Sequence, residues 1–136
     1  MNSVKLFGAI MAVMICVEAY AVNDKLIDAL IITESSGRVN AIGDKGKAFG
    51  QLQIWEVVIK DVNALYKTNY SHADMFNADN SKDVCKKYLA YYGKQYKKET
   101  GKEPDNQVYA RIWNGGPRGY LKKSTKNYWK KVVKYL

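Results

Sequence analysis

The sequence predicts a mainly α-helical fold of the α+β type, with a small β-hairpin or loop insertion. Three observations support this class. Apolar residues recur with helical spacing over most of the chain, a glycine-rich stretch over residues 38–53 interrupts them, and only two prolines occur among 136 residues. Because 47% of the residues are hydrophobic and 26% are charged, the chain can form a packed core.

The first segment of the chain has the features of an export signal. Lys5 precedes an apolar run from Leu6 to Val17, and Ala19 and Ala21 flank one variable position, as at a signal-peptide cleavage site. A membrane anchor is the alternative, but spanning needs about 20 apolar residues and this run is shorter. We therefore expect residues 1–21 to be a signal peptide, residues 22–136 to form the domain, and the protein to be secreted, outside the cell or into the periplasm.

Apolar stripes then predict helices over residues 24–36 and 54–65, from Ser81 through Tyr92, from Asp105 through Ile112, and from Ser124 onward. Ser81, Asp105 and Ser124 are suited to cap helices, because their side-chain oxygens accept hydrogen bonds from free backbone N–H groups. Gly37 is placed to end the first helix. Between the first two helices, residues 38–53 form either a small hairpin or an irregular loop.

The charge of the chain is strongly positive, with 22 Lys+Arg against 13 Asp+Glu and a net charge of +9. Such a charge favours a polyanionic partner, and nucleic acid, an anionic membrane and the bacterial cell wall all qualify. We expect no nucleic-acid binding, because no groove-reading motif is present. The basic residues crowd toward the end, at Lys122, Lys123, Lys126, Lys130, Lys131 and Lys134. This segment either contacts a membrane or packs its apolar side on the core with its lysines in solvent.

Cysteine and histidine are too few for a disulfide framework or a metal site. Cys16 would leave with the signal peptide, so Cys85 has no partner, and we expect it to be a small buried apolar residue. His72 is the single histidine and is expected in a loop. With so few ligands, the sequence indicates no metal and no cofactor.

One acidic residue breaks the apolar pattern of its helix. Ile27, Ile31 and Glu34 fall on one face of the first expected helix, so the Glu34 carboxylate projects from the stripe that faces the core. Partial burial raises the pKa of a carboxyl group, as a general acid working near neutrality requires. Alternatively, Glu34 turns to solvent at the helix end or pairs with Arg38.

The residues after Glu34 resemble a known catalytic segment. The stretches Glu34–Val39 (ESSGRV) and Gly43–Ile54 (GDKGKAFGQLQI) are similar to those of goose-type lysozymes and the related soluble lytic transglycosylases. Downstream, Ala110–Gly116 (ARIWNGG) resembles the Ala-x-x-Tyr-Asn-x-Gly element that lines the sugar groove of that superfamily. Two departures are visible: Trp113 replaces the usual Tyr, and Gln51 and Leu52 replace Leu-Met.

The resemblance implies a lysozyme-like fold and cleavage of the β-1,4 bond between N-acetylmuramic acid and N-acetylglucosamine in peptidoglycan. Glu34 would then be the general acid and afterwards the general base. The resemblance also implies a glycan groove, lined by the insertion, with substrate contacts from Ser35, Gln53, Tyr109, Trp113, Asn114 and Gly115. For Gln53 and Asn114 the alternative is a side chain that satisfies local backbone, and for Trp113 it is core packing.

A second carboxylate would decide whether the reaction is hydrolysis or transglycosylation. Asp44 matches the first of two aspartates with which goose-type lysozymes place a water molecule, but Trp55 occupies the second position. Lytic transglycosylases need neither, because the sugar's own 6-hydroxyl attacks and a 1,6-anhydro product leaves. Both reactions therefore stay open, and Asp44 is alternatively a simple turn residue.

A second class of function also fits the composition. A non-catalytic cationic protein that binds the cell wall, or kills bacteria through its charge, would need the lysines and not Glu34. The enzyme hypothesis instead requires Glu34 for turnover. In either case we expect the partner to be peptidoglycan glycan strands, membrane contact to be confined to the Lys-rich C-terminal segment, and the protein to be a monomer.

Overall fold

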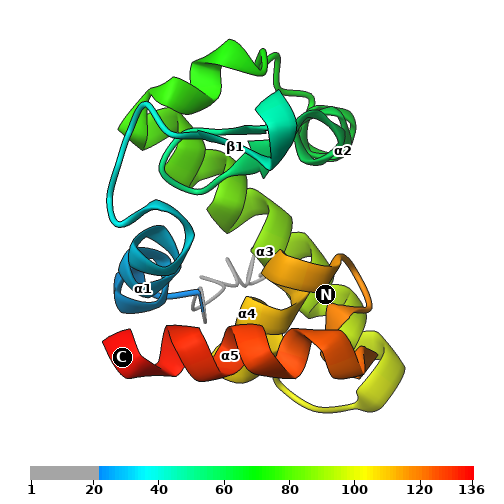
Figure 1. Ribbon diagram of the computed structural model, residues 1–136. Helices are drawn as coiled ribbons and strands as arrows, with labels where there is room; N and C mark the ends of the chain where they lie inside the picture. The colour runs from blue at the N-terminus through cyan, green and yellow to red at the C-terminus, as the bar shows by residue number, and fades with distance from the viewer. Residues whose placement is uncertain (1–21) are drawn as a thin grey trace, which may run out of the picture.

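The structure is a computed structural model, and it describes residues 22–136. The expected signal peptide lies outside the described residues. A long helix, α3 (Ala78–Thr100), runs diagonally through the molecule and joins two groups of elements (Figure 1). None of the described helices is both long and apolar enough to cross a membrane.

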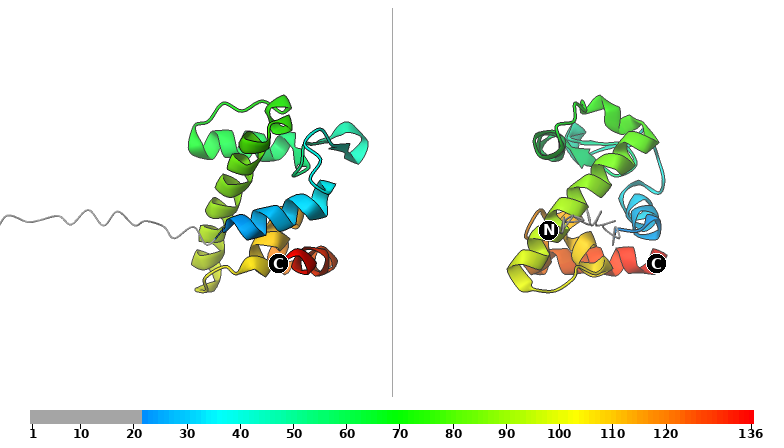
Figure 2. Two further views of the ribbon diagram at one scale, coloured as in Figure 1. Left: turned by 90° about the vertical axis from the view of Figure 1, so that its left-hand side faces the viewer. Right: turned by 180° about the vertical axis from the view of Figure 1, so that it is seen from behind.

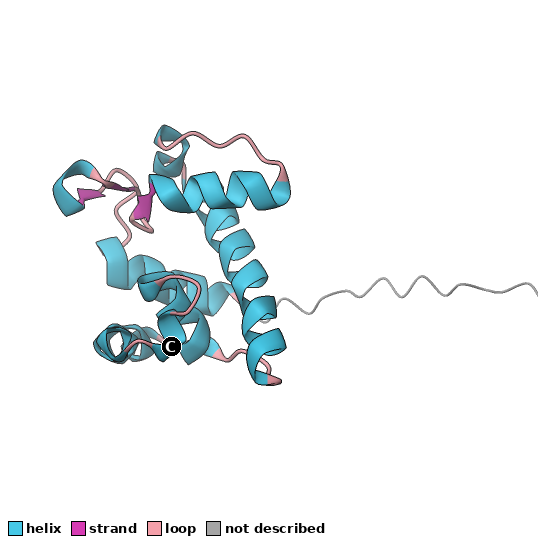
Figure 3. Cartoon of the chain, turned by 90° about the vertical axis from the view of Figure 1, so that its right-hand side faces the viewer, coloured by secondary structure: helices cyan, strands magenta, loops and turns pink. Residues whose placement is uncertain are grey.

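The two groups of elements lie on opposite sides of a cleft. One holds a three-stranded sheet and α2 (Glu56–Tyr66), and the other holds α1 (Asp24–Ser35), α4 (Asn106–Gly115) and α5 (Lys126–Val132). Helix α1 lies between the sheet and α5 (Figure 2). The strands are confined to one edge, and helices make up most of the remaining regular structure (Figure 3). The predicted mainly α fold with a small β insertion is confirmed.

The insertion is a sheet rather than an irregular loop. Strands β1 (Ile42–Gly43), β2 (Ala48–Phe49) and β3 (Ile54–Trp55) pair antiparallel in that order. The turn after β2 requires Gly50, which has φ of +81° and whose added Cβ would lie 2.0 Å from the Met75 carbonyl oxygen. The sheet is thus fixed against the short helical turn that contains Met75.

Side-chain caps set the helix ends, and two of the expected caps are displaced. Asp105 caps α4 as predicted, because its side chain accepts from the Val108 N–H. The prediction for Ser81 is wrong: Asn77 caps α3, and Ser81 lies one turn inside the helix, where it is buried and bonded to Gln51. Ser124 lies in a 3₁₀ turn before α5, so it does not start that helix.

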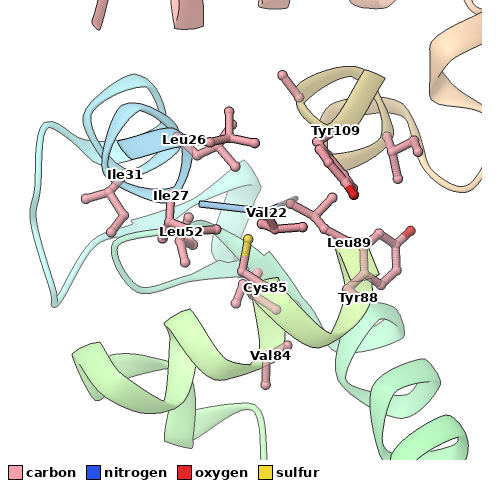
Figure 4. Close-up of a cluster of buried hydrophobic side chains, with 14 of the residues drawn as sticks. Val22, Leu26, Ile27, Ile31, Leu52, Val84, Cys85, Tyr88, Leu89 and Tyr109 are labelled. Atoms are coloured by element: carbon pink, nitrogen blue, oxygen red, sulfur yellow. The ribbon is translucent and has the colours of Figure 1, made fainter. Parts of the chain in front are cut away.

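The core lies where α1, α3 and α4 meet beneath the sheet (Figure 4). Leu26 and Ile27 of α1 and Leu89 of α3 are almost completely buried there. Cys85 is also fully buried, which confirms its role as a small apolar residue, and burial raises the pKa of its thiol. This packed layer holds the last turn of α1, and therefore Glu34, in a fixed position.

Candidate active site

A cleft of about 360 Å³ lies between the sheet side and the α4 side of the molecule. The sheet side contributes residues from the β1–β2 turn, β3 and the start of α2, and the other side contributes the ends of α1 and α4 together with one residue of α3. The lining residues are Glu34, Asp44, Gln53, Ile54, Trp55, Val57, Val58, Tyr88, Trp113, Asn114 and Gly116.

Glu34 lies in the last turn of α1, and its carboxyl group is largely buried. Its Oε1 accepts a hydrogen bond of 2.7 Å from the Tyr128 hydroxyl of α5. Burial raises the pKa of Glu34 to about 7, and the Tyr128 hydrogen bond, which favours the ionised form, opposes this effect. The negative charge of Asp44 adds to the rise in pKa, whereas the positive charge of Lys131 opposes it. Glu34 therefore exchanges a proton near neutrality, as a general acid and base must.

Glu34 neither turns to bulk solvent nor pairs with Arg38, the two alternatives that the sequence left open. Its carboxyl group faces the cleft rather than bulk solvent, and its hydrogen bond goes to Tyr128. Arg38 instead donates from Nε to the Ser35 carbonyl at 3.0 Å, beyond the end of α1.

Asp44 faces the same cleft from an exposed turn. Its Oδ2 accepts a hydrogen bond of 3.0 Å from the indole Nε1 of Trp55. The Lys47 ammonium lies over the Trp55 ring, 5.5 Å from its centre. Asp44 has a φ of 48° and Lys45 a φ of 57°, so two non-glycine residues hold the left-handed conformation in this turn. Asp44 is thus more than a turn residue, because its side chain is fixed by a second cleft residue.

Gln53 lines the cleft, but its amide nitrogen is used within the sheet. Nε2 donates to the Gly50 carbonyl at 3.0 Å and to the Ala41 carbonyl at 3.3 Å. A Cβ added to Gly43 would lie 2.1 Å from Gln53 Oε1, so the glycine leaves room for this side chain. The structure therefore favours the local backbone role for the amide nitrogen of Gln53.

Trp113 and Asn114, at the end of α4, also line the cleft. The Trp113 ring meets Tyr88 of α3 edge to face, with centroids 5.8 Å apart. Asn114 is exposed and makes no side-chain hydrogen bond among the described residues, so its amide group is free for a ligand.

The structure does not bring Ser35, Tyr109 and Gly115 to the cleft surface. Ser35 is buried, and its hydroxyl donates to the Gln51 carbonyl at 2.8 Å. Tyr109 is also buried, where its ring packs against Gly93. A Cβ added to Gly115 would lie 2.5 Å from the Thr125 methyl group, so close packing requires glycine there. None of these three residues is among those that line the cleft, so their contact with substrate stays a prediction.

Several residues of the site carry no sequence signal that would have marked them. Tyr128, which bonds to Glu34 without lining the cleft, is far from it along the chain and is in sequence only one aromatic residue of an amphipathic segment. In the sequence, Tyr88 belongs to the apolar stripe of α3, and Val57 and Val58 belong to the apolar stripe of α2. Only the three-dimensional arrangement reveals that Tyr88, Val57 and Val58 line the same cleft as Glu34.

The Lys-rich segment packs its apolar side on the core. Val132 is fully buried, whereas Lys126, Lys130 and Lys131 are exposed. The apolar side of α5 thus packs on the core, as one of the two alternatives predicts, and membrane contact through the exposed lysines stays a prediction. No acidic residue follows Asp105 in the sequence, so this end of the chain is uniformly positive.

The described residues contain no group of three or more His, Cys, Asp and Glu side chains that could hold a metal ion. His72 comes just before a 3₁₀ turn, where its ring stacks on Phe49 with centroids 3.7 Å apart. Its Nε2 lies 2.7 Å from the Ile54 carbonyl, so His72 holds the sheet against that turn.

A helical domain with a small sheet, and a cleft lined by a half-buried glutamate whose pKa is raised to about 7, defines a lysozyme-like domain. The chain belongs to the transglycosylase SLT domain family, which matches residues 13–135. No curated protein matches the chain. Among solved structures, a chain of the crystal structure of Aeromonas hydrophila PliI in complex with Meretrix lusoria lysozyme is similar, with a TM-score of 0.70 and 26% identity. The similarity covers 84% of this chain and 90% of that one.

Family membership supports a peptidoglycan-cleaving, lytic-transglycosylase-like function. It also implies that the protein binds peptidoglycan as its substrate.

Proposed function

We propose that the protein cleaves the β-1,4 bond between N-acetylmuramic acid and N-acetylglucosamine in peptidoglycan, with Glu34 as the acid and base. One observation carries this proposal: the Glu34 carboxyl group lines the cleft, accepts a hydrogen bond from Tyr128 and has a pKa raised to about 7 by burial. A glycosidic oxygen is a poor leaving group unless a proton reaches it as the bond breaks, and a protonated glutamate supplies that proton.

The reaction would proceed through two proton transfers at the same carboxyl group. Protonated Glu34 donates its proton to the glycosidic oxygen while the bond from that oxygen to C1 of the muramic acid breaks. C1 takes on oxocarbenium character, and the carboxylate of Glu34 then accepts a proton from the attacking hydroxyl group. Attack by the muramic acid's own 6-hydroxyl gives a 1,6-anhydro end, whereas attack by water gives a reducing end.

We propose that the intramolecular route dominates. Glu34 and Asp44 are the two carboxylates that line the cleft, and one oxygen of Asp44 already accepts the Trp55 indole N–H. An inverting hydrolase needs a second carboxylate free to activate water on the opposite face of the sugar, and a retaining hydrolase needs one close enough to attack as the nucleophile. Because Asp44 is held by Trp55 in the exposed turn, it serves better as a fixed negative charge beside the reacting sugar than as a base for water.

The charge of the protein suits the proposed substrate. A net charge of +9, with an end free of acidic residues after Asp105, favours association with carboxylate- and phosphate-rich cell walls. We propose that the protein acts there as a monomer after export and removal of residues 1–21.

Mass spectrometry of soluble products tests the proposal directly. Purified residues 22–136 are incubated with peptidoglycan beside the Glu34→Gln and Glu56→Gln variants. Glu56 is a matched control, because it is exposed and pairs with Lys60 on the surface of α2. We expect 1,6-anhydro products from the parent and from Glu56→Gln, and a loss of roughly 10²- to 10⁴-fold in rate for Glu34→Gln. Reducing-end products would instead establish a hydrolase.

A second candidate is a non-catalytic cationic protein that binds the cell wall. The observation in its favour is the row of exposed lysines on α5, which make no ion pair within 4.0 Å among the described residues. This candidate predicts that neither the parent nor Glu34→Gln releases any product, while both bind peptidoglycan equally. That result would replace the enzyme proposal.

A further inference from the structure

The outer face of α5 is a positively charged surface that lies apart from the Glu34 cleft. Lys126 and Lys130 are about one helical turn apart, and Lys134 follows four residues later in the 3₁₀ turn that continues the helix. We call these three residues the lysine face; all are exposed, and none makes an ion pair among the described residues. The described residues that line the cleft include none from α5, so a partner can reach the lysine face while the cleft holds its substrate.

Packing of the other side of α5 holds the lysine face outward. There Val132 is fully buried, and the Tyr128 hydroxyl donates to Glu34. Figure 1 shows α5 along one edge of the molecule, at the far end from the sheet and α2. Because the helix cannot turn over without exposing its buried side, the three lysines stay at this edge and can approach a flat surface together.

Few negative charges lie near the lysine face. Residues 106–136 hold eight basic side chains and no acidic one, so most of the net charge of +9 arises here. Helix α1, which packs on α5, carries Asp24 near its start, but this carboxylate is already paired with Lys86 of α3 at 2.6 Å. Such a concentration of positive charge favours a surface that presents many negative charges close together.

Exposed apolar side chains lie at both ends of the lysine face. Leu121, before α5, is 65% exposed, and Tyr135 and Leu136, after it, are about half exposed. A soluble polyanion would contact the lysines and leave these apolar groups in water, whereas at a bilayer they reach the boundary between headgroups and acyl chains. Tyrosine suits that boundary because its ring is apolar and its hydroxyl group is polar. The combination therefore favours a lipid surface over a soluble polymer.

We propose that the lysine face of α5 docks the protein on a membrane surface rich in anionic lipids. The three ammonium groups lie against lipid phosphates, and Tyr135 and Leu136 enter the boundary between headgroups and acyl chains. This inference goes beyond the proposed function and does not depend on it, because neither Glu34 nor any other residue that lines the cleft takes part. Docking in this way leaves the cleft free for substrate.

Sedimentation with lipid vesicles measures the docking. The chain used begins at residue 22, because the apolar run within residues 1–21 would bind lipid by itself. The vesicles contain either phosphatidylcholine alone or phosphatidylcholine and phosphatidylglycerol in equal amounts, which adds negative charge to the same bilayer. We expect binding to the anionic vesicles only, and we expect it to weaken as the salt concentration rises, because salt screens the attraction.

Two triple variants with the same net charge locate the surface that binds. The first is Lys126→Gln, Lys130→Gln and Lys134→Gln. Each lysine close to an anionic membrane strengthens binding about fivefold, so this variant should bind the anionic vesicles roughly 100-fold more weakly. The control changes three exposed lysines on the sheet side of the cleft, Lys45→Gln, Lys60→Gln and Lys67→Gln. It should bind less than about threefold more weakly, because charges away from the contact are screened.

Replacing an apolar side chain separates a bilayer from a soluble polyanion. Leu136→Ser should weaken binding to the anionic vesicles roughly tenfold and leave the binding of polyphosphate, a soluble polyanion, unchanged. Ile42→Ser is the matched control, because Ile42 is 62% exposed on β1, on the sheet side of the cleft. It should change neither binding constant.

Three results would overturn the inference. They are equal binding to the two kinds of vesicle, equal losses in the two triple variants, and vesicle binding that Leu136→Ser leaves unchanged while the first triple variant loses polyphosphate and vesicles equally. The last result would assign the lysine face to a soluble polyanion. The product assay with Glu34→Gln tests the proposed function separately. Cleavage without docking refutes the docking alone, and docking without cleavage refutes the enzyme proposal alone.

Discussion

The two sides of the Glu34 cleft place their carboxylates in contrasting surroundings. Glu34 comes from the end of a helix packed on the core, and its group is largely buried against Tyr128 of α5. Asp44 comes from a tight turn of the small sheet, where it is exposed and bonded to the Trp55 indole. Burial rather than residue type therefore separates the two roles: one carboxyl group holds a proton near neutrality, and the other supplies a negative charge that keeps it there.

The largest expected effect concerns stability on the Glu34 side. The pKa of Glu34 is raised from 4.5 to about 7, so the folded protein holds a proton that the unfolded chain releases between these values. The ionised carboxylate therefore destabilises the fold as pH rises through that window, by about 3 kcal/mol once above it. Glu34→Gln, which is neutral at every pH, should gain about this much stability relative to the parent between pH 4 and pH 8, measured by denaturant unfolding.

The matched control for this stability difference is Glu56→Gln, on the exposed surface of α2. Its stability relative to the parent should vary little over the same range, because surface ion pairs contribute at most about 1 kcal/mol. If the stability of Glu34→Gln relative to the parent depends on pH in the same way as that of Glu56→Gln, burial does not raise the pKa of Glu34. The contrast between Glu34 and the exposed Asp44 would then be wrong.

Ser35 connects the two sides of the cleft through its hydroxyl group, and loss of that group should have the next largest effect on stability. Its buried hydroxyl donates to the Gln51 carbonyl of the sheet side and accepts the Arg38 N–H. Ser35→Ala removes the donor to the Gln51 carbonyl and leaves the Arg38 N–H with only its bond of 3.3 Å to the Ser35 carbonyl, so it should cost about 2 kcal/mol in unfolding free energy. The cleavage rate should fall as well, because Glu34 is the preceding residue. A cost no greater than that of the exposed Ser124→Ala would contradict this role.

Removing the Tyr128 hydroxyl should move the pH profile without abolishing activity. The hydrogen bond from Tyr128 favours the ionised form of Glu34 and lowers its pKa. In Tyr128→Phe the pKa of Glu34 rises, so the alkaline limb of kcat/KM should shift to higher pH. The exposed Tyr135→Phe serves as the control, and a shift to lower pH would show that Tyr128 acts otherwise.

Removing the charge of Asp44 should shift the alkaline limb of kcat/KM in the opposite direction from Tyr128→Phe, and this is the smallest of the expected effects. Its negative charge raises the pKa of Glu34, so Asp44→Asn lowers that pKa and shifts the alkaline limb to lower pH. The asparagine oxygen can still accept the Trp55 indole N–H, which preserves the turn. The products should keep their 1,6-anhydro ends. If the alkaline limb of kcat/KM shifts in the same direction in Asp44→Asn and Tyr128→Phe, the two residues do not have opposite effects on the pKa of Glu34.

The sequence predicted the features that depend on neighbouring residues. Helical spacing placed Glu34 on the inner face of α1, and Asp105 capped α4 as its side chain predicts. Asn77 rather than Ser81 capped α3, since both residues are good caps one turn apart and local pattern does not rank them.

Long-range packing decided what the sequence did not predict. The residues of a motif share a spacing whether they reach the cleft or support it from behind, so Ser35 and Tyr109 were assigned to the groove although both are buried. Tyr128 meets Glu34 only because α5 packs beside α1. Such meetings of distant segments leave no periodic signal in the chain.

The central claim is that burial in the cleft keeps Glu34 protonated near neutrality, and carbon-detected NMR of its side-chain carboxyl group tests this most directly. With ¹³C-labelled glutamate, and Glu34→Gln to assign the resonance, the carboxyl shift is followed from acid to alkaline pH. The structure predicts a midpoint at about 7. A midpoint near the ordinary value of 4.5 would show that Glu34 is ionised at neutral pH and would contradict its role as the general acid.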